Sequence, residues 1–276
     1  MWEAVQFLIP PLFACTIILT LLGYLGMHVL KREIIFIDIA LAQIAAVGAT
    51  FAHVFFHSEA DSLLAYGTAF AFTVLASLFF AQIGKRITQI SHEAIIGVSY
   101  AIAAAGALFI ISLDAGGEVH IEHMLTGSIL WAQWPDILLC AGILLLVGVF
   151  HFLYRKKFIS LSEAYAEKLT PKRAAFWDFL FYSSMGLVIT VSVKLAGVLV
   201  IFSFLIIPAT FSALFAIGWS KRLKIAWAIG LFSIICGLAF SYSLDFSCGP
   251  SVVSFLGLSL IIGGIASKIK KQTQIN

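Results

Sequence analysis

Charged residues are scarce in this chain of 276 residues. Asp, Glu, Lys and Arg together make up 11% of it, whereas hydrophobic residues make up 61%. A soluble domain averages about 25% charged and about 45–50% apolar residues. Because water cannot solvate a surface so poor in charge, this composition excludes a soluble enzyme, a disordered chain and a nucleic-acid-binding module.

Cysteine is also rare, and its positions show no pairing. The four residues are Cys15, Cys140, Cys236 and Cys248. No Cys-x-x-Cys spacing occurs among them, and three of the four lie inside apolar runs. The pattern therefore indicates neither a disulfide framework nor a cysteine zinc site.

The common catalytic motifs are missing as well. Gly84-Lys85-Arg86 lacks the upstream glycine and the following Ser or Thr of a Walker A loop. His92-Glu93 is followed by Ile96 where a zinc protease needs its second histidine. Gly257-Leu258-Ser259 does not continue as a Gly-x-Ser-x-Gly nucleophile elbow. We therefore expect neither enzymatic activity nor a permanently bound cofactor.

Long apolar runs fill most of the chain instead. A membrane-spanning helix needs about 20 mostly apolar residues. Nine segments qualify: 5–29, 34–57, 62–83, 93–112, 135–154, 174–193, 195–217, 224–243 and 250–267. The segments lack the strict alternation of a transmembrane β-barrel. The sequence thus predicts an all-α, polytopic helical membrane protein whose residues 1–276 form a single transmembrane domain.

The weakest of these segments is 195–217. Only Lys194 separates it from the preceding segment, and it contains Pro208. A broken or re-entrant helix is tolerated where protein buries the freed backbone groups. The count is therefore nine spans, or eight spans with one helix broken near Pro208.

Basic residues mark one side of the membrane. Sixteen of the 17 Lys and Arg residues fall in alternate loops on the same side, and only Lys194 lies on the other. The positive-inside rule makes the shared side cytoplasmic. We therefore predict that the chain spans the cytoplasmic (inner) membrane of a bacterium, with its N-terminus on the outer side and its C-terminus on the cytoplasmic side.

The longest cytoplasmic connection predicts a short amphipathic helix. It runs over 155–173, where Ser160 and Glu163 have the spacing of an N-terminal capping box. Tyr165 and Leu169 share one face with Leu161 at helical spacing. Such a helix either docks a soluble partner or lies in the lipid headgroup region.

Polar residues at two depths suggest a route for cations. On the outer side, imidazoles stand near acidic residues, which together suit first-row divalent ions; they are His53, His57, His120 and His123. They form either a cation-attracting vestibule or ordinary solvated loops. Within the second span, Asp38 and Gln43 are candidates for a translocation path, and the alternative is that Asp38 pairs with Lys31, Arg32 or another base.

Five segments of the chain resemble the permeases of metal-cation ABC importers, the family that serves zinc, manganese and iron uptake. They are Phe36–Gly48, His92–Gly97, His123–Leu130, Leu195–Thr210 and Leu244–Val253, in the order in which the family has them. The most specific are the Gly-Val-Leu-Val…Ile-Ile-Pro-Ala run and the later Gly-Pro. The five segments are spread along most of the chain, from residue 36 to residue 253.

The resemblance implies a homodimeric permease in the lipid bilayer. Each copy would join one ATPase subunit, and an extracytoplasmic solute-binding protein would deliver a divalent metal as the substrate. The 155–173 segment would then be the element that couples to the ATPase, which favours the docking interpretation of Ser160, Glu163, Tyr165 and Leu169. No role for nucleic acid is implied.

One departure from the family pattern concerns the metal ligands. Family members usually carry Asp and His four residues apart in the second span, whereas this chain has Ile39 and Gln43 there and its carboxylate one residue earlier, at Asp38. One residue is about 100° around a helix, so Asp38 and Gln43 do not recreate the pair. This departure leaves two interpretations: a harder, oxygen-based metal site, or a non-metal substrate on the same scaffold.

Two further interpretations lie outside importers. They are a membrane-embedded hydrolase and a passive channel.

Overall fold

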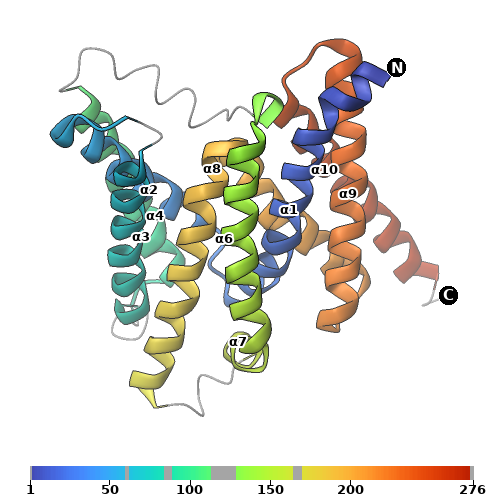
Figure 1. Cartoon of the computed structure of the whole chain (residues 1–276). Coiled ribbons are helices and arrows are strands. Elements are labelled where there is room, and N and C mark those ends of the chain that lie inside the picture. Colours follow the sequence, from blue (N-terminus) through green and yellow to red (C-terminus); the bar gives the residue numbers. More distant parts are fainter. Residues whose placement is uncertain (1, 60–61, 84–88, 113–128, 164–169, 274–276) are drawn as a thin grey trace. The chain divides into compact units, whose positions relative to one another are not determined.

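The structure is a computed structural model of the chain, and it describes residues 2–59, 62–83, 89–112, 129–163 and 170–273. Every regular element in these residues is helical (Figure 1). The elements are α1 (Trp2–Arg32), α2 (Ile37–Phe56), α3 (Leu63–Ile83), α4 (His92–Ile111), η1 (Ile129–Trp131), α6 (Trp134–Leu153), α7 (Arg155–Ser162), α8 (Pro171–Phe215), α9 (Trp219–Leu244) and α10 (Cys248–Thr273).

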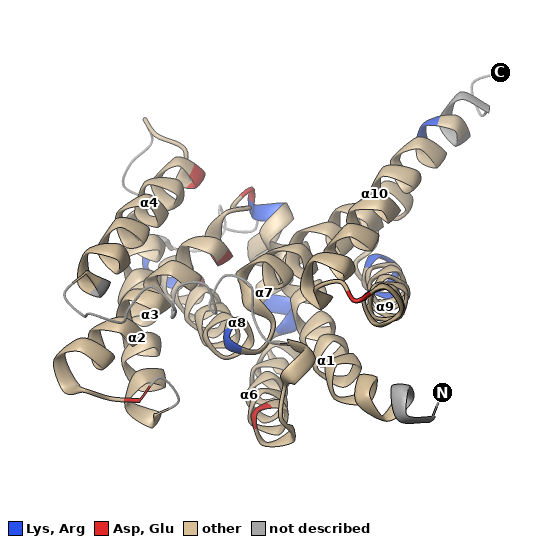
Figure 2. Cartoon of the chain, turned by 90° about the horizontal axis from the view of Figure 1, so that it is seen from above, with Lys and Arg blue, Asp and Glu red and all other residues tan. Residues whose placement is uncertain are grey.

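Eight of the described helices are long and apolar enough to cross a membrane. They account for all nine predicted segments, because α8 contains 174–193 and all but the last two residues of 195–217. Figure 2 shows how little of the helical ribbon carries Lys, Arg, Asp or Glu. The predicted fold class, an all-α polytopic membrane protein, is confirmed.

Helix α8 is 45 residues long, more than twice the length of one membrane crossing. Its backbone leaves helical geometry at Gly197, where φ is 78° and ψ is 157°. A positive φ costs glycine no steric clash, since it has no Cβ. The predicted break near Pro208 is therefore wrong in position: α8 continues through Pro208, whose fixed φ is compatible with a helix, and the interruption lies at Gly197.

By their contacts, the helices divide into two compact units. Unit 1 comprises the described residues of 1–30, 126–144 and 195–276, and unit 2 those of 31–125 and 145–194. Helices α1, α6 and α8 each contribute residues to both units.

Close helix packing holds unit 2 together. Helix α2 packs against both α3 and α4. At Gly48 of α2, an added Cβ would stand 2.7 Å from the carbonyl oxygen of Thr68 in α3. Small residues that let backbones approach this closely are typical of helix interfaces in membranes.

Unit 1 contains the pair α9 and α10, which pack against each other. Helix α1 joins α9 through a hydrogen bond in which the Trp227 indole N–H donates to the carbonyl oxygen of Thr20 at 2.9 Å. Gly230 of α9 faces the side chain of Leu19 in α1. Glycine again sets the distance between neighbouring helices.

Candidate functional site

Asp38 is buried within unit 2. Asp38 lies in the first turn of α2, and only 2% of its surface is exposed. Its Oδ1 atom has no hydrogen-bond partner among the described residues. A buried carboxylate oxygen without a partner is costly, and in a membrane protein such a group usually marks a functional position.

Gln43 lies five residues later in the same helix and is half-buried. Because α2 is regular from Ile37 to Phe56, five residues separate the two side chains by about 140° around its axis. The structure thus places Asp38 and Gln43 on one helix but not on one face. They do not form a two-ligand metal site with each other.

The alternative role for Asp38, an ion pair with Lys31 or Arg32, is wrong. Arg32 instead pairs with Asp178 of α8, with 3.1 Å between Nη1 and Oδ1. This is the one ion pair found among the described residues. Asp178 therefore has a structural partner, and Asp38 has none of that kind in the described part of the chain.

The structure describes only two of the four histidines that were predicted to lie on the outer side. His53, in the last turn of α2, contacts the carbonyl oxygen of Ser58 through Nδ1 at 2.8 Å, and His57 is the exposed, left-handed C-cap of that helix. His120 and His123 lie outside the described residues. No group of three His, Cys, Asp or Glu side chains that could hold a metal occurs in the described ranges.

A short helix exists in the predicted cytoplasmic connection, but it begins earlier than the capping box predicted. Helix α7 runs from Arg155 to Ser162, so Ser160 lies in its last turn and Glu163 is its C-cap. The capping-box prediction is therefore wrong. Tyr165 and Leu169 lie outside the described residues.

The aromatic packing of Phe158 gives the physical reason for this register. Phe158 has no exposed surface. Its ring stacks on His151 of α6, with 4.3 Å between centroids, and meets the edges of further rings. These belong to Phe150, Trp177 and Phe181. Burial of Phe158 outweighs the capping preference of Ser160, because a buried aromatic ring contributes more than the roughly 1 kcal/mol of a cap.

We therefore expect Phe158→Ala to release α7 from unit 2. Emptying this aromatic site should cost about 3–5 kcal/mol. Trypsin should then cut after Arg155, Lys156 or Lys157 at least about tenfold faster, since cleavage requires local opening. Mass spectrometry of the fragments measures this. Phe158→Leu is the milder control, and equal cleavage of Phe158→Ala and wild type would contradict the anchoring role.

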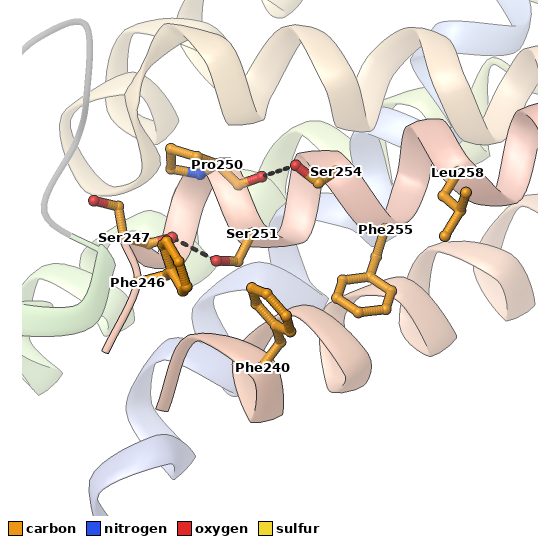
Figure 3. A pocket seen from close by; sticks show the side chains of 8 residues that line it. All are labelled: Phe240, Phe246, Ser247, Pro250, Ser251, Ser254, Phe255 and Leu258. Atoms are coloured by element: carbon orange, nitrogen blue, oxygen red, sulfur yellow. Dashed lines mark hydrogen bonds between the residues drawn. The ribbon is translucent and has the colours of Figure 1, made fainter. Parts of the chain in front are cut away.

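A cavity in unit 1 has a different character. It measures about 510 Å³ and is lined by Phe240, Phe246, Ser247, Pro250, Ser251, Ser254, Phe255 and Leu258 (Figure 3). The hydroxyls of Ser251 and Ser254 donate to carbonyl oxygens of their own helix, those of Ser247 and Pro250. Since no charged side chain lines it, this cavity offers a cation no ligand set.

The long apolar helices, the buried carboxylate and the short helix α7 agree with one known family. The model of the ABC 3 transport family matches residues 4–267. The chain belongs to the ABC 3 transport family.

Several curated relatives of this ABC 3 transport family chain are named as metal transport proteins. It is 24% identical to the manganese import system permease protein ScaB of Streptococcus gordonii, over 70% of this chain and 69% of ScaB. It is also 24% identical to the chelated iron transport system membrane protein YfeC of Yersinia pestis, over 68% of this chain and 64% of YfeC.

A solved structure confirms the fold. PsaBC from Streptococcus pneumoniae, determined with a Fab, superposes with a TM-score of 0.77 at 19% identity, covering 95% of this chain and 94% of that one. This ABC 3 transport family chain is therefore a multi-pass membrane permease, as the resemblance of its five segments implied.

For three residues, the sequence did not predict the roles that they have in unit 2. Arg32, His151 and Phe158 all contribute to the contacts that hold α7. One signal was present: Asp178 is an acid at shallow depth in its span and so required a base nearby. Nothing in the sequence indicated which of the many cytoplasmic bases it would pair with.

Proposed function

We propose that this chain is the membrane permease subunit of an ATP-driven importer for a divalent metal cation of the zinc, manganese and iron class. The family match over residues 4–267 carries the proposal, together with relatives named for manganese and iron transport. ATP hydrolysis would belong to a separate subunit, and the metal would be cargo rather than a resident cofactor.

Asp38 is the proposed cation contact within the path. Its burial and the unpartnered Oδ1 atom support this role, since a passing cation would supply the missing partner. Gln43, half-buried and further along α2, would supply a second, neutral oxygen at a different height. Hard oxygen ligands, met one after the other along the path, suit manganese better than zinc.

The outer histidines would form the entrance. His53, His57, His120 and His123 are proposed to line a vestibule together with nearby acidic residues. Such a rim raises the local concentration of cations. The contact between His53 and the carbonyl oxygen of Ser58 would hold the imidazole ring in place at the end of α2, where we propose the vestibule.

Charge patterning supports a definite topology. With the N-terminus outside, α8 must cross the membrane twice for Lys221 to Lys224 and Lys268 to Lys271 to remain cytoplasmic. Its 45 residues and the interruption at Gly197 provide for two crossings. The C-terminus then lies on the cytoplasmic side of the cytoplasmic (inner) membrane of a bacterium. Residues 1–276 would act as one permease domain.

The coupling segment 155–173, with α7 at its start, is the proposed contact with the ATPase. Arg155, Lys156 and Glu163 of this segment are exposed, and Ser160 is half-buried. The two bases would meet acidic groups of the ATPase, with Tyr165 and Leu169 further along the same segment. The other proposed partners are a solute-binding protein, a second copy of the chain and the lipid bilayer.

Reversing the charge of α7 tests this contact. The double variant Arg155→Glu, Lys156→Glu should weaken association with the ATPase at least about tenfold, equivalent to about 1.4 kcal/mol. Affinity purification of the chain from native membranes, followed by mass spectrometry and an ATPase assay, measures it. The charge-preserving variant Arg155→Lys, Lys156→Arg is the control. Transport by the purified chain without any ATPase would contradict the importer proposal.

A non-metal substrate on the same scaffold is the second candidate. The replacement of the usual pair by Ile39 and Gln43 favours it, as does the absence of a three-ligand group among the described side chains. Metal-independent stimulation of the ATPase by some other solute would support this alternative over metal import.

A further inference from the structure

Arg32 is the centre of a buried polar contact within unit 2. It is the last residue of α1, and its side chain is 8% exposed. Nη1 donates to Oδ1 of Asp178 at 3.1 Å, and Nε donates to Oγ of Ser162 at 3.0 Å. The guanidinium also lies over the Phe181 ring, 4.1 Å from its centroid. One side chain therefore contacts two other helices at the same time.

Ser162 ties this contact to the proposed coupling helix. It is the final residue of α7, and its hydroxyl donates to the carbonyl oxygen of Phe158 at 3.1 Å while accepting from Arg32. Phe158 is the buried ring that anchors α7. The end of α7 is thus fixed both by an aromatic contact and by a charged hydrogen bond.

A second link runs parallel to the first. Nε2 of His151 in α6 is hydrogen-bonded to Oγ of Ser184 in α8 at 2.8 Å. The same imidazole stacks on Phe158 with an interplanar angle of 15°. Helices α6, α7 and α8 therefore meet at one place, and both links lead from α7 to α8.

We propose that Arg32, Ser162 and Asp178 form a clamp through which movements of α7 are transmitted to α8. The proposal rests on the proposed docking of α7 on the ATPase. Arg32 touches neither nucleotide nor cargo, so it is a positioning residue. Its role is to make the end of α7 and the start of α8 move as one body during the ATPase cycle.

The chemistry of arginine suits this role. The planar guanidinium presents N–H groups in fixed directions, so one residue can hold an acid and a hydroxyl in a defined geometry. Lysine carries the same charge as a single point and cannot reproduce both directions. Because the pair is largely buried, mobile salt screens it little. The clamp should therefore remain closed at physiological ionic strength.

Mild variants separate transmission from folding. Arg32→Ala leaves Asp178 buried without its partner and risks misfolding. Ser162→Ala and Arg32→Lys each remove one directed hydrogen bond and keep the ion-pair charges. Loss of a hydrogen bond to a charged group weakens the link by about tenfold or more. Lys31→Met and Ser99→Ala are the matched controls, since Lys31 is exposed and the Ser99 hydroxyl donates within α4.

Hydrogen exchange on the complex with its co-purified ATPase tests the clamp without reference to the cargo. In the wild type and both controls, a non-hydrolysable ATP analogue should change exchange in α7 and in residues 171–185 of α8. In Ser162→Ala and Arg32→Lys, the change in α7 should persist, whereas the change in α8 should be smaller than in the wild type, because only the link through His151 then remains.

Each other outcome overturns the clamp. An undiminished α8 response in the two variants would show that transmission does not pass through Arg32. Loss of the ATPase from both variants would show that these residues only shape the docking surface. An intact wild-type complex with no response in α8 would also refute it. Failure of the wild type to retain any ATPase would instead refute the proposed function.

Discussion

Asp38→Ala is expected to reduce uptake of the transported cation by more than about tenfold, since loss of even an outer-shell partner of a metal ligand costs about 10–100-fold. The physical reason is that Asp38 is the buried carboxylate of α2 and has an oxygen atom without a partner in the described residues. Uptake of radioactive Mn²⁺ by cells that express equal amounts of each variant measures the effect.

Two companion variants sharpen this result. Glu33→Ala removes an exposed acid five residues earlier and should leave uptake unchanged. Asp38→Asn keeps the shape and removes the charge, so it should behave like Asp38→Ala if the carboxylate contacts the cation. Wild-type uptake by Asp38→Ala, with the complex assembled normally, would exclude Asp38 from the path.

Gly26→Leu is expected to abolish folded protein. An added Cβ at Gly26 of α1 would collide with the carbonyl oxygen of Leu205 in α8 and stand 3.3 Å from the Cβ of Ala209. Because a backbone oxygen cannot move aside as a side chain can, the two helices of unit 1 would have to separate. Size-exclusion chromatography in detergent should show loss of the monodisperse species.

Gly142→Leu is the matched control for this collision. Gly142 belongs to the same unit, and an added Cβ there meets nothing within 4 Å. Leucine also has the better helix propensity, since glycine lies about 0.8–1.0 kcal/mol below alanine and leucine ranks close to alanine. We expect Gly142→Leu to match or exceed wild type in thermal stability. Equal stability of the two glycine variants would refute the close approach of α1 and α8.

The membrane helices were predictable because their signal is local. Span 62–83 and α3, for example, agree to within a residue, since a helix must remain apolar for the whole thickness of the bilayer. The position of the break in α8 was less accessible. Pro208 suggested a break in the sequence, but the backbone leaves helical geometry at Gly197. Which glycine interrupts a helix depends on packing in the folded chain.

The candidate site was predictable only in its types of residue. The prediction for Asp38 rests on the rarity of acids inside spans, and the structure shows that this residue is buried. Its surroundings depend on contacts between residues far apart in sequence. The pairing of Arg32 with Asp178 spans 146 positions, and no local pattern encodes it. The register of α7 likewise depended on where Phe158 could be buried.

The central claim, import of a divalent metal, is tested most directly by elemental analysis of whole cells. Strains with and without the gene would be grown on limiting metals, and their manganese, zinc and iron contents measured. We predict a selective fall in one metal without the gene, restored by the wild-type chain but not by Asp38→Ala. Unchanged contents of all three metals would contradict metal import and assign another cargo to the permease.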